Sequence, residues 1–299
     1  MTTNDGAPGL PVLVSAEWLA EHRDDVLVAD VRFYLDGRST REAYLRGHLP
    51  GAVFVDVDRD LSAPAGEGTG RHPLPDPDTF AATLSRLGIG DGTPVVGYDD
   101  VNGSVAARLV WMLRALGSPA ALLDGGITAW PGDLATEPVE PTPRPRTPVP
   151  WPAERIVDTA TVLAESRDPR HVLMDARAHE RYTGAAPAPA DLRPGHIPGA
   201  RSAEWAGNLA DDGRFAAPER LRERFRALGA DTAATITAYC GSGVTACHDL
   251  LALEHAGYTG ARLYPGSWSA WAPDPDLPAE TGDGGPHGDP HGDGERGRA

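Results

Sequence analysis

The chain has 299 residues, of which 40% are hydrophobic and 23% charged, and its formal net charge is −16. This length can accommodate two ordinary domains, each with its own core. The acidic balance argues against nucleic acid as a partner, and no apolar run approaches the roughly 20 residues that a membrane-spanning helix needs. The first residues lack the basic and apolar regions of a signal peptide, so we expect a cytoplasmic protein without a membrane partner.

Short apolar strands alternate with helix-like segments along the first half of the chain. Strands are predicted at 26–31, 53–57, 94–98 and 120–123, and helices at 75–87 and 104–116. A helix before the first of these strands is expected to begin after Ser15, whose hydroxyl can accept a hydrogen bond from the first helical turn. This alternation predicts an α/β fold with a mainly parallel sheet flanked by helices.

Three short motifs occur twice in the same order, which indicates a duplicated domain. The pairs are DVR at 30–32 with DAR at 175–177, GHLPGA at 47–52 with GHIPGA at 195–200, and GGITAW at 125–130 with GSWSAW at 266–271. The expected organisation is an N-terminal tail at 1–11, a first domain at 12–130, a proline-rich linker at 131–152, a second domain at 153–279 and a disordered tail at 280–299.

Cys240 is the candidate nucleophile, because it lies between an apolar strand at 235–239 and a helix beginning near 246. Inward-facing N–H groups of such a loop, and the start of the helix, favour a thiolate over a thiol. The alternative is a small cysteine packed beside a turn, which is the interpretation we prefer for Cys247. The spacing of the two cysteines fits neither a metal site nor a disulfide framework.

The duplication predicts one active site in each chain. Aligning Tyr98 with Tyr239 places Asp99 opposite Cys240, and the first copy contains no cysteine. The site is therefore expected in the second half of the chain, near the seam between the copies, with the first copy forming a wall.

These combined motifs resemble the two-domain rhodanese-type sulfurtransferases over about 12–282. The loop Cys240–Thr245 looks like that of the branch preferring 3-mercaptopyruvate, since thiosulfate-preferring members carry basic residues directly after the cysteine. The resemblance implies an inactive first and a catalytic second rhodanese-like domain. It also implies ping-pong transfer through a Cys240 persulfide, with release of pyruvate and delivery of sulfur to a thiol, thioredoxin-like or cyanide acceptor. It implies no cofactor and no metal.

The same resemblance implies the roles of individual residues. Arg181 matches an arginine that binds the substrate carboxylate, and the loop residues Gly241, Gly243, Val244 and Thr245 are expected at the substrate site. The second family arginine falls at Ala190, so Arg193 is the expected substitute. Ser242, His72 and Asp60 are expected to form a proton relay, against the alternatives of a turn hydroxyl and a surface loop histidine.

Other functions stay open at this point. Thiosulfate is the alternative donor. A cysteine phosphatase is disfavoured, because such enzymes need a loop arginine where this chain has Val244, Thr245 and Ala246. A non-enzymatic sulfur-carrier or redox module would accept persulfide from a protein donor and would show no turnover with small molecules.

Overall fold

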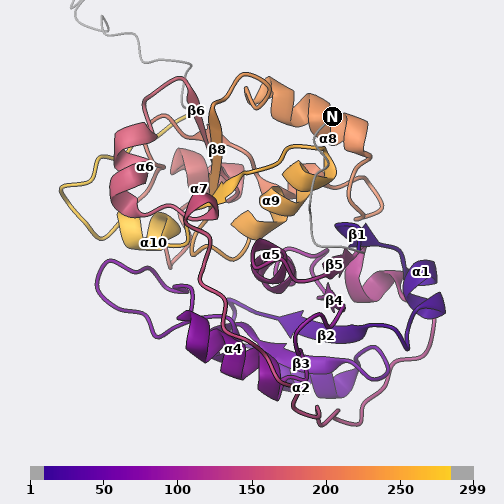
Figure 1. Ribbon diagram of the computed structural model, residues 1–299. Helices are drawn as coiled ribbons and strands as arrows, with labels where there is room; N and C mark the ends of the chain where they lie inside the picture. Colours follow the sequence, from indigo (N-terminus) through magenta and orange to yellow (C-terminus); the bar gives the residue numbers. More distant parts are fainter. Residues whose placement is uncertain (1–9, 284–299) are drawn as a thin grey trace, which may run out of the picture.

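The computed structural model describes residues 10–283, which form two α/β domains (Figure 1). In the first domain the strands are β1 (Leu13–Val14), β2 (Leu27–Arg32), β3 (Val53–Asp56), β4 (Val95–Tyr98) and β5 (Ala120–Leu123). Its helices are α1 (Ala16–Glu21), α2 (Thr40–Arg46), α3 (Val57–Asp60), α4 (Pro77–Arg86), α5 (Ala107–Ala115) and the 3₁₀ helix η1 (Gly126–Ala129). The predicted elements are thus present, and the Ser15 hydroxyl accepts from the backbone N of Trp18 at 3.1 Å, as expected of a helix cap.

The second domain repeats this order. Its strands are β6 (His171–Asp175), β7 (Arg201–Ser202), β8 (Thr235–Tyr239) and β9 (Arg262–Leu263). Its helices are α6 (Thr159–Glu165), α7 (His179–Thr183), α8 (Pro218–Ala227), α9 (Ala246–His255), α10 (Ser267–Trp271) and the 3₁₀ helices η2 (Ala153–Arg155) and η3 (Trp205–Asn208).

The topology of the two sheets confirms the duplication. The first sheet has the strand order β1-β5-β4-β2-β3 and the second β7-β6-β8-β9, and all strand pairs are parallel. Read from the other edge, the second order matches the first, with β9, β8, β6 and β7 in place of β5, β4, β2 and β3. In the second domain the counterpart of β1 is a single parallel bridge between Ile156 and Leu263. The loops that begin with Asp99 and with Cys240 therefore follow equivalent central strands, β4 and β8.

The helices that follow these two loops, α5 and α9, contact each other where the domains meet (Figure 1). Every residue of α5 from Ala107 to Leu113, and of α9 from Ala246 to Leu253, is buried. A helix that is buried on all sides belongs to a core rather than to a surface. The largest apolar cluster accordingly contains residues of both domains. The two copies share one core, which fixes the relative position of the two loops.

The proline-rich linker at 131–152 is extended and follows the surface of the first domain. His48 pairs with Ala135 through two backbone hydrogen bonds of 2.8 and 2.9 Å. Further along, the Trp151 ring N–H donates to the Pro75 carbonyl at 2.7 Å.

The C-terminal boundary differs from the prediction of a disordered tail at 280–299. Glu280 exchanges two backbone hydrogen bonds with His196, of 2.8 and 3.0 Å, and Gly282 N donates to Thr183 O at 2.9 Å. The ordered chain therefore extends to at least Asp283, because this segment pairs with the GHIPGA turn. Residues 1–9 and 284–299, which include most of both predicted tails, lie outside the described residues. Between residues 10 and 283, no helix is both long and apolar enough to span a membrane.

Candidate active site

Cys240 follows β8 directly and lines a cavity of about 390 Å³ between the two domains. Its side chain is largely buried, since the residue is 3% exposed. Gly241, Ser242, Val244 and Thr245 line the same cavity, as predicted from the loop, and residues of the first domain form the opposite wall. The first copy thus contributes the wall that the duplication predicted.

The loop is held from behind by α10. The backbone N of Trp268 donates to Cys240 O at 3.0 Å, and that of Ser269 donates to Gly241 O at 2.9 Å. The Cys240 N–H donates to the Ser267 hydroxyl at 3.1 Å. Within the part of the chain that the structure describes, none of the backbone N–H groups at 241–245 has a protein acceptor. These groups are therefore available to an anion bound at the cysteine.

The first-copy loop shows what such N–H groups can hold. The Asp99 carboxylate, which occupies the cysteine position, is fully buried. It accepts hydrogen bonds from four backbone N–H groups of its own loop, at distances of 2.7 to 2.9 Å. Four donors around two oxygens are the arrangement that an anion requires. The loop of Cys240 occupies the equivalent place in the second copy, and of the two loops it is the one that carries sulfur.

A hydrogen-bonded chain crosses the seam from Ser242 to the first domain. The Ser242 hydroxyl lies 2.7 Å from Nδ1 of His72, and Nε2 of His72 lies 2.9 Å from the Asp58 carboxylate. A carboxylate can only accept, so Nε2 carries the ring proton and Nδ1 accepts from the serine hydroxyl. Burial, and next the charge of Arg108, lower the pKa of His72 and outweigh the opposing effect of Asp58. Solvent screens the effect of the Asp58 charge on His72, because the Asp58 side chain is 68% exposed.

The acidic member of this chain is Asp58, and the prediction of Asp60 is wrong. Asp60 is buried and bound by Arg59 at 2.8 and 2.9 Å, by Arg86 at 2.5 Å and by the backbone N of Asp56 at 2.9 Å. Both aspartates belong to the four-residue helix α3, and residues two apart on a helix point in different directions. Asp60 turns into the domain, whereas Asp58 turns toward the seam.

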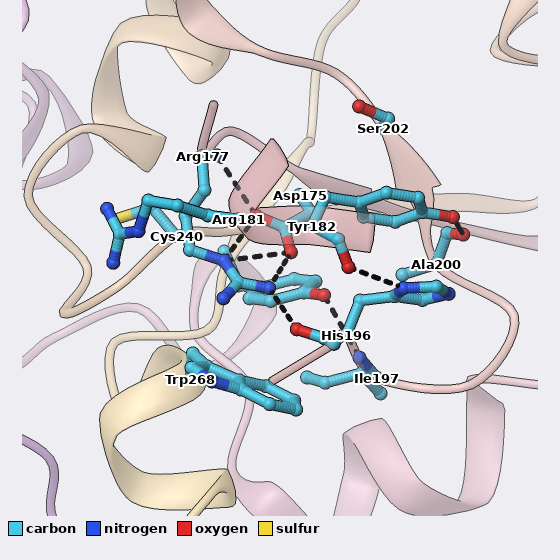
Figure 2. Close-up of polar contacts among 12 residues, drawn as sticks. Asp175, Arg177, Arg181, Tyr182, His196, Ile197, Ala200, Ser202, Cys240 and Trp268 are labelled. Carbon is cyan, nitrogen blue, oxygen red and sulfur yellow. Dashed lines mark hydrogen bonds and ion pairs between the residues drawn. The ribbon is translucent and has the colours of Figure 1, made fainter. Parts of the chain in front are cut away.

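Two arginines approach the cysteine loop. Arg181 of α7 lines the cavity beside Cys240 (Figure 2), and its guanidinium is bound by both carboxylate oxygens of Asp191, at 2.6 and 2.8 Å. The second arginine is Arg71, from the first-domain loop between α3 and α4, which the sequence analysis missed. Its Nη1 donates to the carbonyl of Ala190 at 2.9 Å. A Cβ built on Gly241 would lie 3.1 Å from Nη2 of each arginine, so both groups converge on the residue next to Cys240.

The family model of the rhodanese-like domain matches this chain twice, at residues 15–133 and 158–274. This chain belongs to the rhodanese family. A Pseudomonas aeruginosa protein provisionally named 3-mercaptopyruvate sulfurtransferase is 46% identical to it, over 91% of this chain and 98% of the relative. The 3-mercaptopyruvate sulfurtransferase of Escherichia coli is 35% identical, over 89% and 97%. A Mycobacterium tuberculosis protein provisionally named thiosulfate sulfurtransferase SseB is 40% identical, over 91% and 97%.

Solved structures agree with this membership. The crystal structure of SseA from Escherichia coli, described as a 3-mercaptopyruvate sulfotransferase of rhodanese fold, superposes with a TM-score of 0.76 at 34% identity, over 87% of this chain and all of that one. A Leishmania major 3-mercaptopyruvate sulfurtransferase gives 0.74 at 32% identity, over 87% and 73%. The predicted family, tandem fold and enzyme class are thereby confirmed.

Two expected substrate contacts of this rhodanese-family chain do not reach the cavity. Arg193 is not among the residues that line the cavity, and its Nη2 donates to the Leu277 carbonyl at 2.7 Å. Its backbone carbonyl accepts from the Trp268 ring N–H at 3.1 Å. Gly243 has φ +76, and a Cβ there would lie 2.7 Å from a backbone carbonyl oxygen. Gly243 is therefore needed for the turn of the loop rather than for contact with substrate.

The second cysteine has a structural environment. Cys247 is fully buried in α9, and its thiol lies 3.4 Å from the Gly243 carbonyl. Burial raises the pKa of Cys247 to about 12, so its sulfur stays a neutral thiol. The same carbonyl accepts from the buried Arg108 at 2.8 Å. Arg108 also donates to the His72 carbonyl at 2.9 Å, and so connects the cysteine loop to the segment that carries His72.

The paired DxR and GH motifs of the rhodanese repeat hold the fold in both copies. Arg177 binds the Asp175 carboxylate and the Gly195 carbonyl and packs against the Trp268 ring (Figure 2). Arg32 makes the equivalent bonds to Asp30 and Gly47 in the first domain. Because the copy without a cysteine keeps them, these contacts serve the fold that both copies share. Within residues 10–283, no three His, Cys, Asp or Glu side chains are grouped so as to hold a metal ion.

Proposed function

We propose that this chain transfers the sulfur of 3-mercaptopyruvate, through a persulfide on Cys240, to a thiol, thioredoxin-like or cyanide acceptor. The Cys240 thiolate attacks the donor sulfur, a sulfur–sulfur bond forms, and the carbon–sulfur bond breaks. The electron pair of that bond leaves on carbon as the enolate of pyruvate. Attack of the acceptor on the outer sulfur then returns the thiolate.

The observation that carries this proposal is the chain from Ser242 through His72 to Asp58, next to Cys240. The enolate of pyruvate needs a proton to become pyruvate, and the Ser242 hydroxyl lies on the wall of the same cavity as Cys240. The neutral Nδ1 of His72 can take up the proton of the donor thiol through Ser242 as the sulfur is attacked, and return it by the same route to the enolate; the bond from Nε2 to Asp58 stabilises the protonated ring in between. Sulfite, the group that leaves from thiosulfate, departs as a stable anion and needs no proton. A built proton source therefore favours the keto-acid donor.

The loop's free N–H groups support both half-reactions. They can balance the negative charge on sulfur when it is a thiolate and again when it is a persulfide. The position of Asp99 among the corresponding groups of the first copy supports this role.

A parallel assay with both donors tests the proposal. With cyanide as acceptor, wild-type protein is expected to release pyruvate and thiocyanate in equal amounts from 3-mercaptopyruvate, with a higher kcat/KM than for thiosulfate. Cys240→Ser is expected to be inactive with either donor. Turnover by Cys240→Ser would refute the mechanism, and turnover with a protein persulfide alone would favour a sulfur carrier.

Thiosulfate is the second candidate donor, and the arginine pair favours it. Arg71 and Arg181 place two guanidinium groups beside Gly241. The loop Cys240–Thr245 itself has no basic residue. A dianion could use both charges. A higher kcat/KM with thiosulfate than with 3-mercaptopyruvate would establish this alternative and leave Cys240 as the nucleophile.

A further inference from the structure

Arg108 is a fully buried cation at the seam between the two domains. It lies at the start of α5, and within residues 10–283 no carboxylate is at ion-pair distance from its guanidinium. Burial lowers the pKa of Arg108, yet a guanidinium stays charged at neutral pH. A buried charge without a carboxylate partner destabilises a fold unless hydrogen bonds compensate for it. The acceptors that Arg108 binds therefore show what keeps it in place.

Two of its hydrogen bonds fix segments of the first domain. Nη2 of Arg108 donates to the carbonyl of His72 at 2.9 Å and to that of Leu61 at 3.2 Å. Leu61 caps the end of α3, and α3 carries Asp58, whose carboxylate binds the His72 ring. Arg108 therefore holds the backbone of both first-domain members of the hydrogen-bonded chain that ends at Ser242.

The third hydrogen bond crosses the seam. Nη1 of Arg108 donates to the carbonyl of Gly243 at 2.8 Å, and Gly243 directly follows Ser242 in the cysteine loop. The bond between the Ser242 hydroxyl and the His72 ring crosses the same seam, so both of its ends are held by one rigid, planar guanidinium. The position of Cys240 has separate supports, the two backbone hydrogen bonds from α10.

The geometry points to Arg108 as a positioning residue, which keeps the Ser242 hydroxyl and the His72 ring in register across the seam. This inference rests on the proposed function, because it takes the hydrogen-bonded chain to carry the proton to the enolate. The charge of Arg108 has a second effect on His72. Together with burial and the charge of Arg71, and against that of Asp58, it favours the neutral imidazole, which is the form that can accept from Ser242.

The first-copy loop fixes the start of the helix that carries Arg108. The Asp99 carboxylate accepts from the backbone N–H groups of Val105 and Ala106, directly before α5, at 2.8 Å each. Arg108 is the second residue of α5. The domain without a cysteine thus supplies both the histidine of the chain and the arginine that positions it.

The first test compares the two donors at saturation. For Arg108→Gln, kcat with 3-mercaptopyruvate is expected to fall by about 10- to 100-fold, because a misplacement of about 1 Å in a reacting group can cost 100-fold. The rate with thiosulfate should stay within about threefold, because sulfite leaves without a proton. Combined with Ser242→Ala, the same substitution should cost less than a further threefold, because the hydroxyl that Arg108 positions is absent.

A pH profile supplies a readout that a merely structural role would not move. Arg108→Gln removes a positive charge that lowers the pKa of His72, so the fall in kcat/KM on the acid side should move to higher pH. Arg108→Lys keeps the charge but not the planar fork, so it should lower kcat without that movement. The matched control is Arg114→Gln, which removes another arginine of α5, bound across the seam to Glu254 at 2.5 Å. This control should change neither the donor preference nor the pH profile.

A measurement without turnover keeps the inference testable by itself. Nitrogen-15 NMR of histidine-labelled protein follows the His72 ring directly, and His72→Gln identifies its signal. Wild-type protein should show the proton on Nε2 and a titration below the ordinary value of about 6.5. The titration should move to higher pH in Arg108→Gln and stay in place in Arg108→Lys. Urea unfolding shows whether each variant is folded, and Arg108→Lys carries the kinetic test if Arg108→Gln is not.

Several outcomes would overturn the inference. Equal losses with both donors would mean that Arg108 supports the cysteine loop as a whole. A full further loss in the double variant with Ser242→Ala would mean that Arg108 does not act through the bond between serine and histidine. An unmoved His72 titration in Arg108→Gln would remove the effect of its charge. A wild-type protein that turns over thiosulfate but not 3-mercaptopyruvate contradicts the proposed function, and the His72 spectra then decide the role of Arg108.

Discussion

Replacing Ser242 by alanine removes the hydroxyl that joins the cysteine loop to His72. The structure places this hydroxyl 2.7 Å from the histidine ring and on the wall of the same cavity as Cys240. Positioned proton transfer contributes about 10²- to 10⁴-fold to a rate. Solvent screens the charge of the exposed Asp58 at one end of this hydrogen-bonded chain, so we expect a rate contribution in the lower part of that range. The predicted fall in kcat with 3-mercaptopyruvate is about 10²- to 10³-fold, or about 3 to 4 kcal/mol in activation free energy.

The same variant should behave differently with thiosulfate, because sulfite leaves without a proton. We expect the thiosulfate rate of Ser242→Ala to stay within about threefold of wild type. The variant also leaves the buried Nδ1 of His72 without its donor, which costs about 1 to 3 kcal/mol of stability. Urea unfolding measures that cost and shows whether the protein is folded at the assay temperature.

The assay is steady-state release of pyruvate or sulfite, with cyanide as acceptor and both donors at saturation. An equal loss with the two donors would refute the reasoning, because it would place Ser242 in thiolate activation or loop structure rather than in protonation of the enolate. A loss smaller than about fivefold with 3-mercaptopyruvate would show that water supplies the proton.

Three further predictions follow from the same geometry. Burial lowers the pKa of His72, so the fall in kcat/KM on the acid side of the pH profile, where the ring becomes protonated, should lie below the ordinary histidine value of about 6.5. Asp58→Asn removes a charge that raises this pKa, so the pH profile of that variant should show the same fall at still lower pH. Gly243→Ala places a Cβ 2.7 Å from a backbone carbonyl at φ +76, whereas Gly260→Ala at φ +74 meets nothing within 4 Å, so calorimetry should show the larger fall in Tm for Gly243→Ala. Asp99→Ala leaves four buried N–H groups without an acceptor and should lower the free energy of unfolding by roughly 3 to 5 kcal/mol in urea titrations.

The repeated motifs made the fold predictable from the sequence. Each motif marks a strand end or a turn, and the same order of strands and helices in both halves requires the same sheet twice. The position of Cys240 followed from the strand before it and the helix after it, and its uniqueness followed from Asp99. These are local features of the chain, which is why sequence patterns report them well.

The partners of Cys240 were harder to predict, because they depend on which way side chains point across the seam. Asp58 and Asp60 both precede His72 at similar spacing, and only the packing of α3 shows that Asp60 faces inward. Arg193 is near Ala190 in sequence, but its guanidinium binds the Leu277 carbonyl and does not line the cavity. Arg71 is adjacent to His72, and that adjacency was the available signal. Neighbours of a residue assigned to an inter-domain relay are themselves candidates for the same interface.

The carboxylate of Asp99 suggests how a sulfur could be stored between the two half-reactions. A persulfide, like a carboxylate, presents its negative charge on an atom one bond beyond the point of attachment. The first-copy loop shows that such a group can be fully enclosed by backbone donors, whose hydrogen bonds oppose the rise in the pKa of Asp99 that burial causes. We therefore expect the sulfur-loaded form of Cys240 to be a resting state with a lifetime of its own, in which the loop is better satisfied than in the empty enzyme. In this comparison the Asp99 carboxylate of the first domain permanently occupies the position that the outer sulfur of the Cys240 persulfide would occupy in the second domain during turnover.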